Sequence, residues 1–340
     1  MGLFDWLWGH KAGEDNTDGA LDAAVEHLVD AMDPRLRMVD GYARKLRPAV
    51  QQALARLEAV VGAIPGPVEF SRATWAQDPL VRALFASPQE LAHTFSAEPV
   101  VQEFFTAAGN ALDDHCCLAL FASQEDKTSL GFALQGDVMQ SDVVRHSVSF
   151  SDHRLTRPAA TDAGVRAGLR DLGLHYLANQ ALELITGSRN QRQMLQEERN
   201  LLALRLSTRC RFDHALESLL EQGRCGDSDA EGLRRQLDDT ERRLASLGTP
   251  PRTLDEYLVF LQNVLEHAAD YVSIHARDLR LDAMNIVVED ASIKAIHIGL
   301  CELRADGRPP RVVVIARFPR RELLSKQDLE AAAYRDRPLL

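Results

Sequence analysis

The sequence predicts a helix-dominated α+β fold, and three observations support this prediction. Apolar residues recur at helical spacing over most of the chain. Two regions, 115–150 and 271–318, change to the short alternating or continuous apolar runs that are typical of strands. Segments rich in Gly, Pro and Asp separate these regions. We therefore expect N-terminal helices, a small antiparallel meander, a long helix with an antiparallel helical hairpin, and C-terminal antiparallel strands.

The first eight residues, MGLFDWLW, are rich in large apolar side chains. A polar segment with Gly, Asp and Asn follows them, so we interpret residues 1–19 as an apolar tip on a flexible acidic tether. Trp and Phe suit an interface that buries an apolar ring. We expect the tip to dock on a groove of the protein itself, or to contact a partner or a membrane surface. The tip residues are Leu3, Phe4, Trp6, Leu7 and Trp8.

Helices are expected from residue 20 to 63 and again from 78 to 110. The first stretch has apolar residues at helical spacing, an interruption at Asp33-Pro34 and an end at Gly62. The second stretch reads as three short helices, each opened by a proline in or near its first turn, where the missing N–H costs little. Ser87 and Glu90 have the spacing of a capping box at the start of one of them.

Strands are expected next, in the segments CCLALFA, SLGFALQ and VVRHSVSF of the 115–150 region. We predict that they form a three-stranded meander. Together with the strands expected near the C-terminus, this meander gives two small sheets. We expect the chain to divide into residues 1–19, 20–158 and 159–340.

A long helical stretch is predicted from 161 to 222, with a weak point near Gly187. The segments 230–247 and 254–268 then carry apolar residues at the alternating spacing of a coiled-coil seam. We predict that these two helices pair antiparallel and pack on the long helix. Thr253 and Glu256 form a second capping box.

The last predicted strands are YVSIHARDLRL, IKAIHIGLCEL and RVVVIARF. Asp306-Gly307 is a strong hairpin signal between the final two. Several arginines of this region give it a local positive balance, which suits either a solvated strand face or an acidic partner.

Composition limits the function. The net charge of -11 disfavours general nucleic-acid binding, because an acidic protein repels the phosphate backbone. The five cysteines are odd in number and lack C-x-x-C spacing, so a secreted disulfide framework and a zinc ribbon are both disfavoured. We expect a bacterial-type cytosolic protein without a signal peptide, and no cofactor or metal.

Two segments contain residue types that serve catalysis or ligand binding. In DDHCC, His115 and Cys117 would share one face of a strand, but the other metal ligands are missing. The segment RHSVSFSDHRL is richer, and we expect its charged and hydroxyl groups to bind an anion where the strand ends. The candidate ligand-binding residues are Arg145, Ser149, Asp152, His153 and Arg154.

No phosphate-binding loop, dinucleotide fingerprint, zinc-protease motif or nucleophile elbow occurs in the sequence. The leading hypothesis is therefore a non-enzymatic interaction, regulatory or scaffold protein, peripheral to the inner membrane if its tip binds there. The alternative is an enzyme or ligand-binding protein with an anion pocket at residues 145–154. Self-association through the helices of 161–270 is compatible with both.

Overall fold

The structure, a computed structural model, describes residues 14–110, 112–135, 138–217, 227–248, 250–251, 253–282, 284–288, 295–325 and 327–329. Side chains of residues 14–18, 131–143, 210–217 and 227–229 are not described. The helix-dominated α+β class is confirmed, and the chain forms two compact units. One unit takes residues from 1–50 and 176–266, and the other takes residues from 51–175 and 267–340. The domain border predicted between residues 158 and 159 does not coincide with the borders between these units. Helices α3 (Tyr42–Gly62) and α8 (Asp162–Glu217) each contribute residues to both units.

The first unit is built from helices. Asp33 ends one helix and caps the next, because its side chain accepts a hydrogen bond from the backbone N–H of Arg35 at 3.0 Å. The interruption predicted at Asp33-Pro34 is therefore confirmed. The elements are α2 (Glu14–Met32), η1 (Pro34–Met38), the start of α3 (Tyr42–Gly62), the later part of α8 (Asp162–Glu217), α9 (Asp227–Ser246) and α10 (Leu254–Glu266).

Helix α8 runs through 56 residues without a break, about 84 Å at 1.5 Å per residue. The weak point expected at Gly187 does not end it. A glycine inside a helix costs only about 1 kcal/mol relative to alanine. The favourable residues on both sides outweigh that cost.

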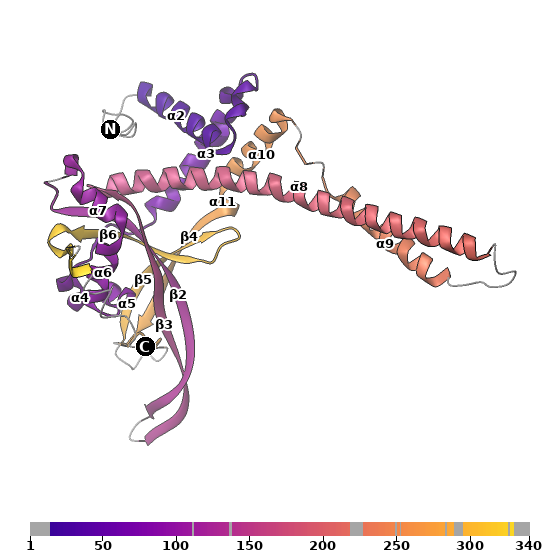
Figure 1. The fold of residues 1–340 in the computed structure, drawn as a ribbon. Helices are drawn as coiled ribbons and strands as arrows, with labels where there is room; N and C mark the ends of the chain where they lie inside the picture. Colours follow the sequence, from indigo (N-terminus) through magenta and orange to yellow (C-terminus); the bar gives the residue numbers. More distant parts are fainter. Residues whose placement is uncertain are drawn as a thin grey trace. The chain divides into compact units, whose positions relative to one another are not determined.

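The helical hairpin is formed by α8 and α9, which lie side by side in Figure 1. Arg199 of α8 donates a hydrogen bond from Nε to Glu241 of α9 at 2.9 Å. Helix α10 instead contacts α3, where Gln262 donates to the carbonyl oxygen of Lys45 at 2.7 Å. The predicted pairing of the helices 230–247 and 254–268 is therefore wrong. The apolar residues of both predicted seams are nevertheless buried or half-buried. Thr253 and Glu256 form the predicted capping box, with both bonds at 3.3 Å.

The second unit is a sheet covered by helices on both faces. Five strands lie in the order β3-β2-β6-β5-β4, with antiparallel neighbours, and β1 pairs parallel with the end of β6. The two small sheets that we expected are therefore one. The strands are β1 (Val68–Glu69), β2 (His115–Gln135), β3 (Val138–Ala159), β4 (Val272–Leu281), β5 (Ile296–Ala305) and β6 (Arg311–Pro319).

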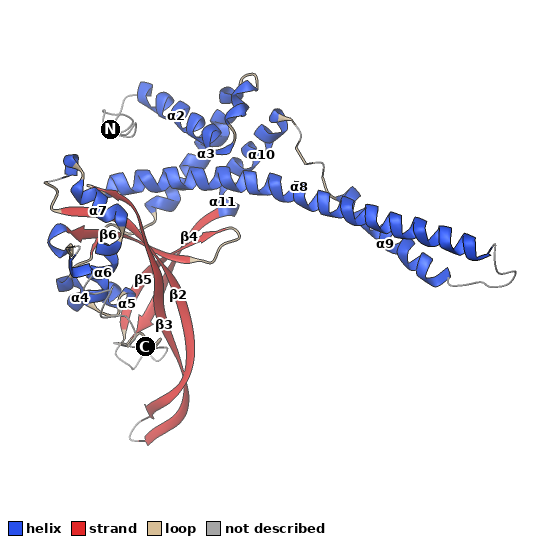
Figure 2. Cartoon of the chain, in the orientation of Figure 1, coloured by secondary structure: helices blue, strands red, loops and turns tan. Residues whose placement is uncertain are grey.

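Region 115–159 holds two long strands rather than a three-stranded meander (Figure 2). The polar segment 123–128 continues β2 and stays paired with residues 146–151 of β3. Strand β6 pairs with β2 only as far as Ala122. Beyond that point β2 and β3 form a two-stranded ribbon without β6. Its polar side chains remain in water, so this part of the sequence shows no alternating apolar pattern.

The sheet curls until its two edge strands are joined. The segment after β4 forms a tight turn, in which the Asp282 carboxylate accepts hydrogen bonds from the N–H groups of Met284 and Ile286. Val287 then donates its N–H to the carbonyl oxygen of His146 in β3 at 2.7 Å, and Leu281 of β4 bridges to Val287. Right-handed twist and bulges in β3 favour such curling.

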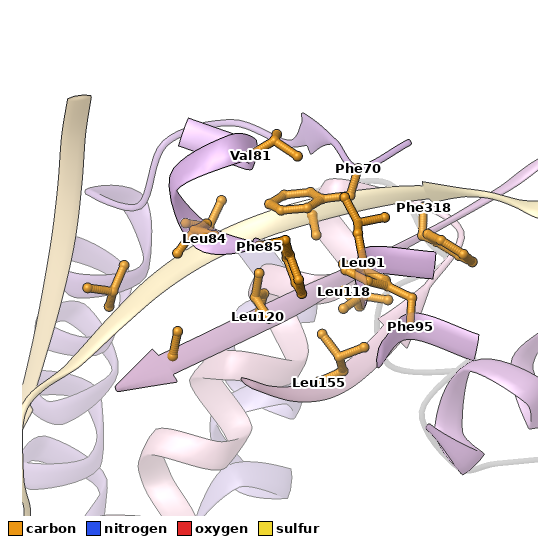
Figure 3. Packing of buried hydrophobic residues seen from close by; sticks show 14 of the residues in the cluster. Phe70, Val81, Leu84, Phe85, Leu91, Phe95, Leu118, Leu120, Leu155 and Phe318 are labelled. Carbon is orange, nitrogen blue, oxygen red and sulfur yellow. The ribbon is translucent and has the colours of Figure 1, made fainter. Parts of the chain in front are cut away.

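One face of this sheet packs on short helices around a cluster of phenylalanines (Figure 3). Phe318 of β6 stacks on Phe95 with ring centroids 4.7 Å apart, and Phe70 and Phe85 surround the same ring. Three of these helices begin with the prolines that the sequence predicted. The helices are α4 (Arg72–Gln77), α5 (Pro79–Leu84), α6 (Pro88–Ala97) and α7 (Pro99–Thr106), and the remaining short elements are η2 (Ala108–Asn110), α11 (Ala268–Tyr271) and η3 (Arg320–Glu322).

The opposite face of the sheet carries Ile315 and other apolar residues against α3 and the start of α8. Arg166 of α8 donates hydrogen bonds to the carbonyl oxygens of Val61 at 2.6 Å and Ile64 at 3.0 Å. These carbonyls lie at and just beyond the end of α3, where the regular helical hydrogen bonds stop; that of Val61 also accepts the N–H of Ile64 at 3.2 Å. The sheet is thus the middle layer of three.

Candidate functional site

Asp152 and Arg154, two of the predicted ligand-binding residues, meet Arg311 on the surface of the sheet. The Asp152 carboxylate accepts a hydrogen bond from Arg154 Nε at 3.1 Å and pairs with Arg311, which also donates to the Asp152 carbonyl oxygen at 3.2 Å. Arg311 and then Arg154 hold the pKa of this carboxyl below its usual range. The two guanidinium groups and one carboxylate form a cluster with a formal charge of +1, in which Asp152 and Arg154 are exposed and Arg311 is half-buried.

The strand exit expected at Asp152 is a β-bulge. Two residues of β3, Asp152 and His153, lie opposite the single Ala122 of β2, since Phe121 pairs with Arg154 and Ser123 with Ser151. Asp152 adopts a φ of 48°, a left-handed conformation that aspartate tolerates better than most residues. Strand β3 continues beyond it to Ala159.

This bulge reverses which side chains face the core. Before it, Val148 is buried in the core, so Arg145 and Ser149 lie on the opposite face. After it, His153 and Leu155 face the core. The five predicted ligand-binding residues are therefore divided between two faces, and only Asp152 and Arg154 are brought together.

His153 has a structural environment. Its ring stacks on Phe85 with centroids 4.4 Å apart, and Nε2 lies 2.8 Å from the carbonyl oxygen of Leu84, to which it donates. Burial lowers the pKa of His153. Burial therefore favours the neutral imidazole, against the opposing effect of the hydrogen bond to Leu84.

We expect His153→Gln to flatten the dependence of stability on pH. Below the ordinary histidine pKa of about 6.5 the unfolded chain takes up a proton that folded His153 resists. Its contribution is present above that pH and is lost as the pH falls toward the lowered folded pKa. Glutamine keeps a donor for Leu84 but does not titrate. Urea unfolding between pH 7.5 and 5 measures the slope, and an equal slope in the two proteins would contradict this assignment.

The cysteines of DDHCC point to opposite faces of β2. Cys116 is buried with the phenylalanine cluster, and Cys117 is buried against α3 and α8. Burial raises the pKa of Cys116 to about 12, so its thiol stays protonated at neutral pH. Among the residues that the structure describes, no group of three or more His, Cys, Asp or Glu side chains is placed to hold a metal ion.

Arginines of the C-terminal strands are used within the fold. Arg304 bonds to the buried Glu302 at 2.6 Å, and Arg321 pairs with Glu69 at 3.4 Å. Arg320 donates to backbone carbonyl oxygens of Asp113 at 2.8 Å and Asn110 at 2.7 Å. These contacts account for part of the local positive balance without an external partner.

A surface that the sequence reasoning missed lies on α8. Met194, Leu201 and Leu204 are 69%, 49% and 63% exposed. Leu195 and Leu202 share the face of Arg199, which bonds to α9, and are only 5% and 6% exposed. We call Met194, Leu201 and Leu204 the α8 outer stripe. The signal was present in the seven- and three-residue spacing of this stripe.

The predicted tip, Leu3 to Trp8, lies outside the described residues. Among the helices that are described, none combines the length and the apolar character needed to cross a bilayer. Compared with known proteins, the chain matches no family model, no curated protein and no solved structure.

Proposed function

We propose that this chain is a non-enzymatic interaction or scaffold protein that binds its partner through the α8 outer stripe. The observation that supports this most directly is the exposure of three large apolar side chains on one side of a paired helix. Isolated apolar residues on a surface are ordinary, but apolar residues that recur along one helix face are typical of a contact site. Helix α9 already covers the other side of α8.

The sheet unit fits the role of a structural platform. Several of its residues of catalytic type have partners inside the fold: two arginines hold Asp152, Phe85 and Leu84 hold His153, and Cys116, Cys117 and Cys301 are buried. These contacts support the non-enzymatic proposal over an anion pocket.

The test compares complexes that are cross-linked inside cells that express the chain natively, before lysis dilutes them, and are then separated by size in the extract. We expect the wild-type chain to migrate in a complex larger than its own 37.8 kDa, and Leu201→Glu with Leu204→Glu to release it. The control, Gln196→Glu with Gln236→Glu, adds the same charge at two exposed positions of the α8–α9 hairpin outside the stripe. A complex that survives the stripe substitutions, or a wild-type chain that migrates alone, would exclude the proposed function.

The apolar tip is a second contact site in this proposal, one that holds the chain to a partner or to the inner face of a membrane. Its support is the sequence alone, five large apolar residues ahead of an acidic tether. The same extracts test it: deletion of residues 2–8 is expected to move the protein out of the membrane fraction or the complex. Unchanged partitioning would remove the tip from the proposal.

A further inference from the structure

The spacing of the α8 outer stripe defines a seam of coiled-coil type. Met194 and Leu201 are seven residues apart and occupy equivalent positions, and Leu204 follows three residues later. The same heptad register places Glu197 and Thr208 on the seam, and it places Glu198 and Arg205 at the positions that flank the seam. A second helix that packs on this seam must fit these charges as well as the apolar residues.

An antiparallel copy of the same helix fits both. When Leu201 of one copy faces Leu204 of the other, the two-fold axis passes between residues 202 and 203, so the same contact occurs twice. In this register Thr208 faces Glu197 of the other copy at each end. Leu201 and Leu204 form an apolar centre, the layers on either side of it are polar, and Met194 lies beyond these layers, outside the centre.

The charges beside the seam are complementary in the same register. Glu198 of one copy lies beside Arg205 of the other, and the symmetry repeats this pair. Within one helix these residues are separated by about 10.5 Å along the axis, so they do not pair with each other. Among the described side chains, neither has an ion pair.

A parallel pairing of two copies does not fit. It would place Glu197 against Glu197 of the other copy on the seam, where like charges repel. It would also set Arg205 beside the uncharged Asn200. The sequence of the stripe therefore selects the antiparallel arrangement.

From these contacts we infer that the partner of the α8 outer stripe is a second copy of this chain, paired antiparallel through Leu201, Leu204, Glu198 and Arg205. The inference rests on the proposed function, because it names the occupant of the same surface. The apolar centre has two layers, far smaller than a standard interface of about 20–30 residues a side, so the dimer should dissociate on dilution.

The test is the mass of the purified full chain over a range of concentrations, by light scattering and sedimentation. We expect a shift from 37.8 kDa to twice that mass as concentration rises. Leu201→Glu with Leu204→Glu should abolish the shift, because it places carboxylates in the apolar centre. The control pair Gln196→Glu with Gln236→Glu should leave it unchanged. Circular dichroism verifies that all variants retain their helices.

A charge exchange tests the register. Glu198→Arg should weaken the dimer about tenfold, since it replaces two attractive pairs by two repulsive ones. Adding Arg205→Glu should restore the dissociation constant to within about threefold of wild type. Restoration is specific to pairing between copies, because the two positions do not touch within one helix.

Three outcomes would overturn the inference. They are a monomer at every concentration, a dimer indifferent to the stripe substitutions, and a charge exchange that fails to restore pairing. A purified monomer whose complex in the cell extract still requires the stripe would reject self-pairing and leave the proposed function intact. A complex in the extract that ignores the stripe would reject both.

Discussion

Replacing Phe95 with alanine is expected to lower the free energy of unfolding by about 3–5 kcal/mol, the usual cost of deleting a buried phenyl ring. Phe95 is fully buried and touches rings from three other parts of the second unit. Phe318 comes from β6, Phe70 follows β1 and Phe85 follows α5. Because these rings are held by separate hydrogen-bonded elements, their surroundings can move inward only in part, and most of the cavity remains.

Urea unfolding followed by the fluorescence of Trp75 provides the measurement, because Trp75 donates its Nε1–H to the carbonyl oxygen of Phe85 at 2.8 Å. Replacing Trp6 and Trp8 by phenylalanine makes it the sole tryptophan. Leu112→Ala is the matched control, since Leu112 is 95% exposed and should change stability by less than about 0.5 kcal/mol. A loss below about 1 kcal/mol for Phe95→Ala would mean that the ring cluster does not hold this unit together.

Much of the fold was predictable because its signals are local. Prolines opened α5, α6 and α7 as expected, and Asp33 separated two helices. Gly307 has a φ of 67° in the predicted hairpin between β5 and β6. Each of these signals depends on residues within one or two turns of chain.

Pairing between distant segments was not predictable in the same way. The buried faces of α9 and α10 follow the predicted seams, but a seam does not specify which helix will cover it. In the structure Glu241 meets Arg199 of α8, and Gln262 meets Lys45 of α3. Likewise, β6 lies between β2 and β5, and this placement turns two expected sheets into one.

A single inserted residue decides which candidate residue faces the core: it turns His153 inward, while Arg154 stays on the outer face with Arg145 and Ser149. Regular alternation had already separated the serines from His146, but it could not predict that the core face changes at Asp152. A bulge depends on the partner strand, here one β2 residue opposite two in β3. Arg311, which pairs with Asp152, lies more than 150 residues away in sequence. The ion-pair cluster was thus visible only in part, as Asp152 and Arg154.

Arg320 and Arg321 are adjacent and look alike in sequence, but we expect them to contribute unequally to stability. Arg320→Ala is expected to cost about 2–3 kcal/mol, while Arg321→Ala should cost less than about 1 kcal/mol. Arg320 donates to carbonyl oxygens of Asp113, Asn110 and Phe105 and lies over the Phe105 ring, 4.7 Å from its centroid. It therefore fastens the loop before β2 to the end of β6.

Arg321 differs from Arg320 in its surroundings. Its side chain is 71% exposed, and it pairs with the half-buried Glu69 at 3.4 Å. Urea unfolding measures the stability of the two alanine variants and of Arg320→Lys. Lysine keeps the positive charge but lacks the planar set of N–H donors, so this third variant distinguishes geometry from charge. If Arg320→Lys retains full stability, the positive charge alone suffices. If the two alanine variants lose equal stability, the loop does not depend on Arg320. Arg320 would then again be a candidate residue for contact with an acidic partner.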